Sequence, residues 1–212
     1  MNLFILSKNP REAAQAHGDK HVIKMLLEAC QMLYCAHWIA VYPELLEHKS
    51  AIRISQAQKE LSVPEHMQKA PTRKGTTEIG FRPVHLHHPC TKWVRACAGN
   101  YLWAVELALA LAAEYEYRFG PNKEHCCRQH AIWLACHLPP GISRRERVDF
   151  ALAMDDMYKV SDDAVENYIN YYRTSKQERG LTTYTRRSPP SYIVPKVVHE
   201  KAEVAGSIIL PR

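Results

Sequence analysis

Residues 22–36 read VIKMLLEACQMLYCA, an apolar stretch interrupted by three polar side chains. Lys24, Glu28 and Gln31 stand at positions i, i+4 and i+7, a spacing that places them in one row along a single helix face. The apolar residues cover the other faces, so we expect this helix to be buried over most of its surface. The stretch predicts a mainly α protein, a single-domain helical bundle with this helix at its centre.

The polar row extends upstream by helical steps to His21 and His17, with Asp19 at its edge. One interpretation is a solvent-facing stripe, because every helix of a water-exposed domain needs a wet side. The other is the lining of a cleft, since histidine titrates near neutral pH and buried polar groups need partners. Under the second interpretation the candidate catalytic residues are His21, Glu28 and His17, and the candidate binding residues are Asp19, Lys24 and Gln31.

Periodicity and breaker residues set the remaining elements. Asn9-Pro10 is typical of a helix start, and Gly18 predicts a kink in the first helix. The sequence predicts helices over residues 11–41, 50–61, 89–119, 123–137 and 161–177. It also predicts a short β-strand at 2–7, a strand or turn at 79–82, a long central loop over 43–88, and an irregular tail at 193–212 after a helical domain of residues 1–192.

Composition limits the class of protein. The chain has 212 residues, 46% hydrophobic and 24% charged, which is typical of a globular domain. It has no run of 18 apolar residues and no signal-peptide core, so we expect a cytoplasmic protein with no membrane partner. Seven cysteines without a repeated CxxC motif indicate reduced thiols. No cofactor is expected.

Basic residues gather near the end of the chain, whose formal net charge is +6. Eight fall in the last 40 residues, among them Arg173, Lys176, Arg179, Arg186, Arg187, Lys196 and Lys201. The segment from Tyr168 to Arg173 interleaves aromatic side chains with this charge, as surfaces that stack nucleobases do. DNA binding and an ordinary solvated tail both stay open.

The densest group of possible metal ligands is His85-Leu86-His87-His88-Pro89-Cys90. A structural zinc site normally has two separated ligand pairs, and the second pair is missing unless the fold brings up His125, Cys126 and Cys127. We therefore expect no metal, and polar contacts at a helix start whose free N–H groups could hold a phosphate or carboxylate. Asn100, in an apolar stretch, is either a site residue or a tie between helices. The candidate binding residues outside the first helix are Arg82, His85, His88, Trp93, Arg95, Asn100, Asn170 and Tyr171.

Several long motifs resemble a protein family widespread in tailed bacteriophages, over roughly residues 1–192. They are Asp19-Lys20-His21-x-x-Lys24-Met25-x-x-Glu28-x-x-Gln31, His85-x-x-His88-Pro89-Cys90-x-x-Trp93-x-Arg95, Asn100-Tyr101-x-Trp103, Glu114-Tyr115-x-Tyr117-Arg118-Phe119-Gly120, Ala151-x-Ala153-Met154 with Tyr158-Lys159, and Tyr168-x-Asn170-Tyr171-Tyr172. The chain departs from the family pattern at Asp155, where the family has proline, and at Tyr184 and Tyr192, where it has tryptophan.

The resemblance implies a link to phage enzymes of thymine hypermodification, the amino acid:DNA transferases related to α-glutamyl/putrescinyl thymine pyrophosphorylases. Such an enzyme acts in the bacterial host cytoplasm and replaces the phosphate of a 5-phosphomethyl-uracil base in DNA by the amine of a free amino acid. His21, His17 or Glu28 would then serve as the base, with Lys24, Arg82 and Arg95 as phosphate ligands. Trp93, Asn100 and Tyr171 would hold the flipped base.

Two alternatives stay open beside transfer. One is a glycosylase that excises a DNA base and uses Glu28 or Asp19 as its acid. The other is a non-enzymatic module that binds DNA or a host protein through the basic segment.

Overall fold

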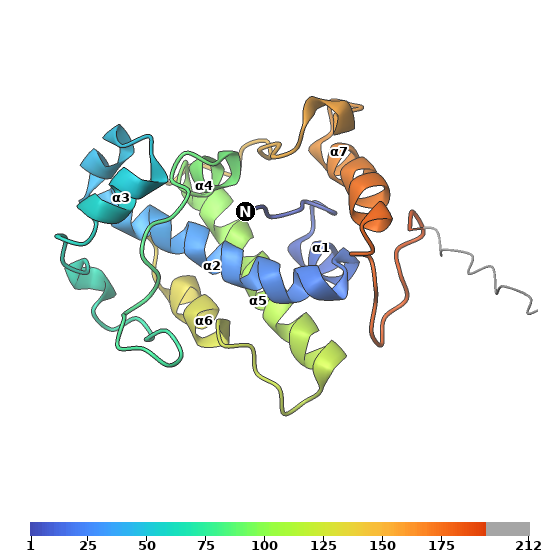
Figure 1. Ribbon diagram of the computed structural model, residues 1–212, viewed down its shortest axis with the longest axis horizontal. Coiled ribbons are helices and arrows are strands. Elements are labelled where there is room, and N and C mark those ends of the chain that lie inside the picture. Colours follow the sequence, from blue (N-terminus) through green and yellow to red (C-terminus); the bar gives the residue numbers. More distant parts are fainter. Residues whose placement is uncertain (194–212) are drawn as a thin grey trace, which may run out of the picture.

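The computed structural model describes residues 1–193 and is mainly helical, as predicted (Figure 1). Two long helices, α2 (Asp19–Val41) and α5 (Ala98–Phe119), cross at the centre of the molecule and carry much of the buried apolar core. Three shorter helices pack on this pair: α1 (Pro10–Ala16), α4 (Pro89–Val94) and α6 (Arg128–Cys136).

The other elements lie at the two ends of the molecule (Figure 1). They are α3 (Ala51–Ala57), α7 (Ala164–Tyr171), the π-helical turn Tyr172–Lys176, and the 3₁₀ turns Pro43–Glu47, Glu65–Met67 and Asp156–Tyr158. None of the described helices is long and apolar enough to span a bilayer. Most of the predicted tail, residues 194–212, lies outside the described residues.

The first predicted helix, 11–41, is divided at Gly18 into α1 and α2. A Cβ atom on Gly18 would overlap the carbonyl oxygen of Leu181, so only glycine allows the C-terminal segment to cross here. The backbone N–H of Asp19 donates to the carbonyl of Thr183 at 2.8 Å, which satisfies one of the free groups at the start of α2. The expected kink is therefore a complete break that a distant segment crosses.

The second predicted helix, 89–119, is divided in the same way into α4 and α5. A Cβ atom on Gly99 would overlap the backbone nitrogen of Arg147. The N–H of Ala98 donates to Ser143 O at 2.8 Å, and that of Gly99 donates to Arg145 O at 3.1 Å. An extended segment again takes the place of a side-chain cap.

The predicted N-terminal β-strand is wrong, because residues 2–7 form no strand. The segment is deeply buried from Leu3 to Leu6, and its amide groups bond to side chains. The N–H of Asn2 donates to Glu28 Oε2 at 2.8 Å, and those of Leu3 and Phe4 donate to Asn2 Oδ1 at 2.8 and 3.0 Å. The apolar residues therefore indicate that this segment is buried among helices, not that it forms a strand. A buried extended segment is stable as long as its backbone polar groups are hydrogen-bonded.

Other boundaries move by a few residues. Helix α6 begins at Arg128, five residues later than expected from its periodicity, because residues 120–127 form a loop. Helix α7 begins after Asp163, whose carboxylate accepts the N–H of Val165 at 2.7 Å as an N-cap. The central loop holds α3 within its predicted range, and residues 72 and 79 pair in an isolated β-bridge.

Four parts of the chain meet at the buried guanidinium of Arg118, which is 1% exposed. Its Nε donates to Glu114 at 2.7 Å, and its two terminal nitrogens donate to Asp19 Oδ1 and to the carbonyl of Gln15, both at 3.0 Å. Glu114 also accepts two hydrogen bonds from Arg187. This network joins α1, α2, α5 and the C-terminal segment.

We expect Arg118→Met to lower the free energy of unfolding by about 3–5 kcal/mol, because Asp19 would lose its ion pair and Glu114 would lose one of its two. The matched control is Arg128→Met, which breaks an exposed pair with Glu116 on the same helix α5. That change should cost less than about 1 kcal/mol. Urea unfolding of the two variants checks the difference, and equal losses would contradict a central role for Arg118.

Candidate functional site

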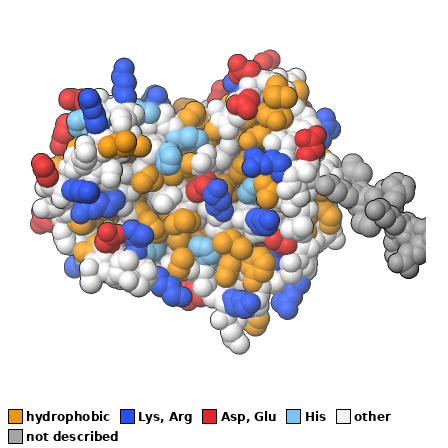
Figure 2. Space-filling view, in the orientation of Figure 1, with side chains coloured by type: hydrophobic (Ala, Val, Ile, Leu, Met, Phe, Trp, Pro, Cys, Tyr) orange, Lys and Arg blue, Asp and Glu red, His pale blue; other side chains and the backbone are white. Residues whose placement is uncertain are grey.

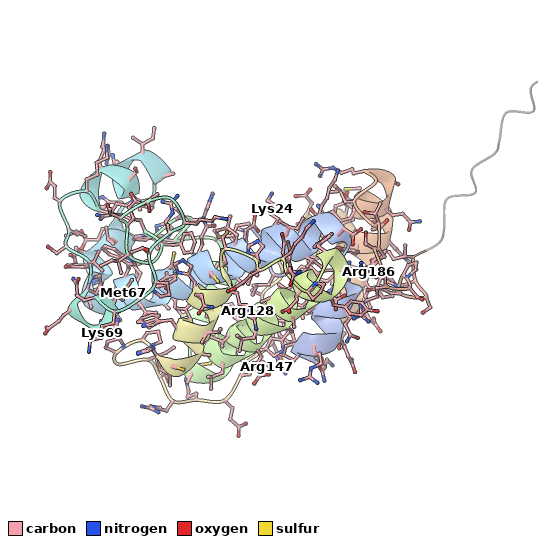
Figure 3. The ribbon with its side chains drawn as sticks, turned by 90° about the horizontal axis from the view of Figure 1, so that it is seen from below. Lys24, Met67, Lys69, Arg128, Arg147 and Arg186 are labelled. Carbon is pink, nitrogen blue, oxygen red and sulfur yellow. The ribbon has the colours of Figure 1, made fainter. Side chains whose placement is uncertain are left out.

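A pocket of about 240 Å³ opens where α2 meets the N-terminal residues and the C-terminal segment. Three residues of the predicted row, His21, Lys24 and Glu28, line it from α2. Across from them stand three residues that follow one another closely in sequence, Tyr171, Lys176 and Arg179. Figure 2 shows basic side chains on the face where α2 approaches α7, and Figure 3 labels Lys24 near that end of α2.

His21 is held by the hydroxyl group of Tyr172. The Tyr172 OH accepts the N–H of Gly18 at 2.7 Å and lies 2.6 Å from His21 Nδ1. Burial raises the pKa of Tyr172 well above 10, so the hydroxyl stays protonated at neutral pH. It therefore donates a hydrogen bond to His21 Nδ1. The neutral imidazole then carries its own proton on Nε2.

The charge state of His21 follows from the same surroundings. Burial is the largest cause that lowers the pKa of His21 to about 3, followed by the nearness of His17, which disfavours a second protonated imidazole, and by the charge of Lys176. Burial likewise lowers the pKa of His17 to about 4, and His17 Nδ1 lies 2.6 Å from the carbonyl of Ala13. Both residues are neutral at pH 7. His21 is therefore a hydrogen-bond donor toward the pocket and a weak base, and His17 does not line the pocket.

Glu28 is the one carboxylate among the described residues that line the pocket. The residue is 7% exposed, and its Oε2 accepts the N–H of Asn2. Two primary amines flank it: Lys24 Nζ lies 3.6 Å from Oε1, and the amino group of Met1 lies 3.8 Å from Oε2. Glu28 can therefore accept a proton from an amine or donate one to a leaving group.

Lys176 is a buried cation, 6% exposed. Its Nζ donates to the hydroxyl of Tyr171 at 2.7 Å and lies 4.1 Å from the centre of the Tyr171 ring. Among the described residues no carboxylate pairs with it. Lys24, Lys176 and Arg179 thus place three cations around one carboxylate, which favours an anionic ligand.

Phe4 also lines the pocket, beside His21 and Tyr171. Its backbone has φ of +45°, a left-handed conformation that costs free energy for any residue other than glycine. Its ring lies 4.7 Å from that of His21 and 6.0 Å from that of Tyr171. Sequence reasoning assigned Phe4 to a strand, and Lys176 and Arg179 only to a basic cluster. The only sequence feature that pointed to Lys176 and Arg179 was their position within a few residues of Tyr171, a predicted binding residue.

The other predicted residues of the first helix and of the C-terminal half lie outside this pocket. Asp19 turns toward Arg118 and accepts the N–H of Thr185 at 2.9 Å. Gln31 is half-buried, one turn beyond Glu28. Asn170 donates to the carbonyl of Tyr158 at 3.1 Å.

The predicted residues near α4 also make structural contacts. His88 caps α4, with Nδ1 accepting the N–H of Cys90 at 3.2 Å, and burial lowers its pKa to about 4. Arg95 donates to Leu86 O at 2.6 Å. Asn100 bonds the carbonyl of Trp93 at 2.7 Å and the N–H of Val148 at 2.9 Å, so the structure favours the inter-helix tie.

The last three predicted residues lie in three different surroundings. Trp93 packs in the core against Trp103 and Phe150. Arg82 bonds the carbonyls of Gln58 and Leu61. His85 is exposed and, like Phe4, has a positive φ, +49°.

Comparison with known proteins finds no match: no protein-family model, no curated protein and no solved structure matches this chain. What the pocket can bind therefore follows from its own side chains. They offer three cations, one carboxylate, one neutral imidazole and two aromatic rings.

We expect acid to destabilise the protein partly through His21. An unfolded histidine has a pKa near 6.5 and His21 has one of about 3, so only the unfolded state gains this proton as pH falls from 6.5 toward 3. The stability that neutral His21 provides is present above pH 6.5 and is lost between pH 6.5 and 3, by about 1.4 kcal/mol per pH unit.

His21→Gln should reduce the slope of the unfolding free energy against pH by that amount. Urea unfolding at pH 7, 6 and 5 measures it, with exposed His85→Gln as control. An unchanged slope for His21→Gln would refute the assignment.

Proposed function

We propose that this protein modifies a pyrimidine base of DNA at the pocket around Glu28, by transferring an amino acid to 5-phosphomethyl-uracil with loss of phosphate. The observation that carries the proposal is buried Lys176, a cation without a carboxylate partner among the described residues, in a pocket with two further cations. A phosphate group would supply the missing negative charge. The resemblance to the phage family supplies the expected substrate and the setting, the cytoplasm of an infected bacterium.

The reaction gives each pocket residue a role. The amine nitrogen of the amino acid bonds to the methylene carbon of the base, and the bond from that carbon to the phosphate oxygen breaks. Lys24, Lys176 and Arg179 would hold the departing inorganic phosphate, and His21 Nε2–H would donate to one of its oxygens. Glu28 would accept the proton that the attacking ammonium loses.

The size of the pocket fits a small reacting group. Its 240 Å³ lies below the roughly 300–1,000 Å³ of sites for drug-sized ligands, so it would receive one base and its phosphate rather than a stretch of duplex. The base would have to leave the helix stack to reach Glu28. Tyr171, which lines the pocket, would contact the base there.

Base excision is a second candidate, favoured by the primary amine of Lys24, which lies 3.6 Å from Glu28. In that reaction an amine bonds to C1′ of the sugar, the bond from C1′ to the base breaks, and the base leaves with a proton. The product is an imine between protein and DNA. Glu28 would supply the proton.

One experiment separates these functions. Purified protein is incubated with DNA that contains phosphomethyl-uracil and with a mixture of amino acids, and the nucleosides are then analysed by mass spectrometry. A nucleoside heavier by an amino acid, with release of phosphate, is the expected result. Free base, together with a borohydride-trapped protein–DNA adduct, would support excision instead. Binding of the DNA without either product would leave a non-enzymatic module and overturn both enzyme proposals.

Two variants test the residues. Glu28→Gln should abolish product under either enzyme proposal, and full activity would remove the first helix from the mechanism. Lys176→Met should lower kcat/KM by about 100-fold through loss of phosphate stabilisation. Lys69→Met, which removes an exposed lysine elsewhere, is the matched control and should change nothing.

A further inference from the structure

Three residues that directly precede α6 bring metal-type ligands together. One ligand atom from each of His125, Cys126 and Cys127 lies within 4.8 Å of the others. Among the described residues no other group of three histidine, cysteine or acidic side chains converges in this way. The histidine-rich segment 85–90, where the sequence is densest in such ligands, does not.

The two thiols converge although they are neighbours in sequence. Cys127 has φ of −92° and ψ of −1°, a conformation outside the extended region in which consecutive side chains point to opposite sides. The Sγ atoms of Cys126 and Cys127 lie 4.0 Å apart. A zinc ion bound to sulfur at about 2.3 Å in a tetrahedron requires about 3.8 Å between two sulfur atoms. The observed separation fits that geometry closely.

His125 is positioned beside these thiols. Its Nδ1 accepts the N–H of Cys127 at 3.1 Å, which fixes the imidazole next to the thiols, and this hydrogen bond would open for Nδ1 to bind a metal. The ring of Tyr115 packs edge-on against the imidazole, with centroids 5.0 Å apart. Both contacts restrict the orientation of the ring before any ion binds.

A fourth thiol comes from the centre of the bundle. Cys30, on α2, is fully buried, and its Sγ lies 3.8 Å from the carbonyl of Cys127. Cys30 stands two residues after Glu28, about 200° around the helix, so this cluster faces away from the pocket.

We propose that His125, Cys126 and Cys127 bind a thiophilic divalent cation, Zn²⁺, and that Cys30, which lies beside this group but outside it, turns toward the ion as the fourth ligand. Three thiols and one imidazole form one of the common ligand sets of structural zinc. Each ligating thiol gives its proton to solvent, so one Zn²⁺ displaces three protons. The ion would fix the start of α6, which Figure 3 marks at Arg128, to the middle of α2. It is independent of the reaction proposed at the pocket.

Cobalt substitution tests the proposal without any activity assay. Reduced full-length protein is titrated with Co²⁺ and then with Zn²⁺ while the absorption spectrum is recorded. The expected result is one equivalent of tetrahedral, thiolate-bound cobalt that Zn²⁺ displaces. The absence of the tetrahedral spectrum, or a spectrum without thiolate-to-cobalt absorption, would overturn the proposal.

Matched cysteine variants locate the site. Cys126→Ser should weaken zinc binding at least about tenfold. It alters an exposed side chain, so loss of folding should not obscure the result. Cys136→Ser, which removes another exposed cysteine at the end of α6, should leave zinc binding unchanged.

In wild-type protein, Zn²⁺ should also protect the Cys126 thiol, but not the Cys136 thiol, from alkylation by iodoacetamide. Equal behaviour of the two variants, or equal alkylation of the two thiols, would refute the assignment.

Discussion

The arrangement of the molecule depends on one guanidinium that has been removed from water. Burial of a charge is costly unless partners surround it, and the partners of Arg118 come from parts of the chain about 100 residues apart. Asp19 begins α2, Glu114 belongs to α5, and Arg187 continues the network into the C-terminal segment. The same segment carries Tyr172 and Lys176 over the start of α2. The network thus helps to hold the C-terminal segment against the start of the chain, where the pocket lies.

Two glycines allow the backbone approaches that complete this arrangement. At both Gly18 and Gly99 a helix begins without a side-chain cap, and carbonyl groups of a distant segment accept its free N–H groups. Local sequence predicts the helices well, because their apolar periodicity runs unbroken past both positions. It cannot predict the breaks, because each depends on a segment at least 40 residues away, around Arg147 or Leu181.

The candidate site divides in the same way between local and distant information. Helical spacing alone predicts that His21, Lys24 and Glu28 share a face, and all three line one pocket. Spacing cannot say what lies opposite, so Phe4 and Lys176 escaped prediction. Asp19 illustrates what helical spacing cannot predict. It stands at the edge of the same row, but its carboxylate pairs with Arg118 instead of lining the pocket. A periodic pattern identifies a polar face, and only tertiary contacts decide which of its members a ligand can reach.

Charge balance separates the two groups of buried ions. The structural network contains Arg118 and Arg187 with Asp19 and Glu114, so each positive charge has a negative partner within hydrogen-bond distance. The pocket contains three cations and one carboxylate, and its most buried cation, Lys176, contacts a tyrosine hydroxyl and two aromatic rings but no carboxylate of the described residues. A cation buried for stability alone gains most from a carboxylate partner, which the first group has and the second lacks. The imbalance around Lys176 is what the phosphate of the proposed substrate would offset, and it distinguishes the pocket from the network that supports it.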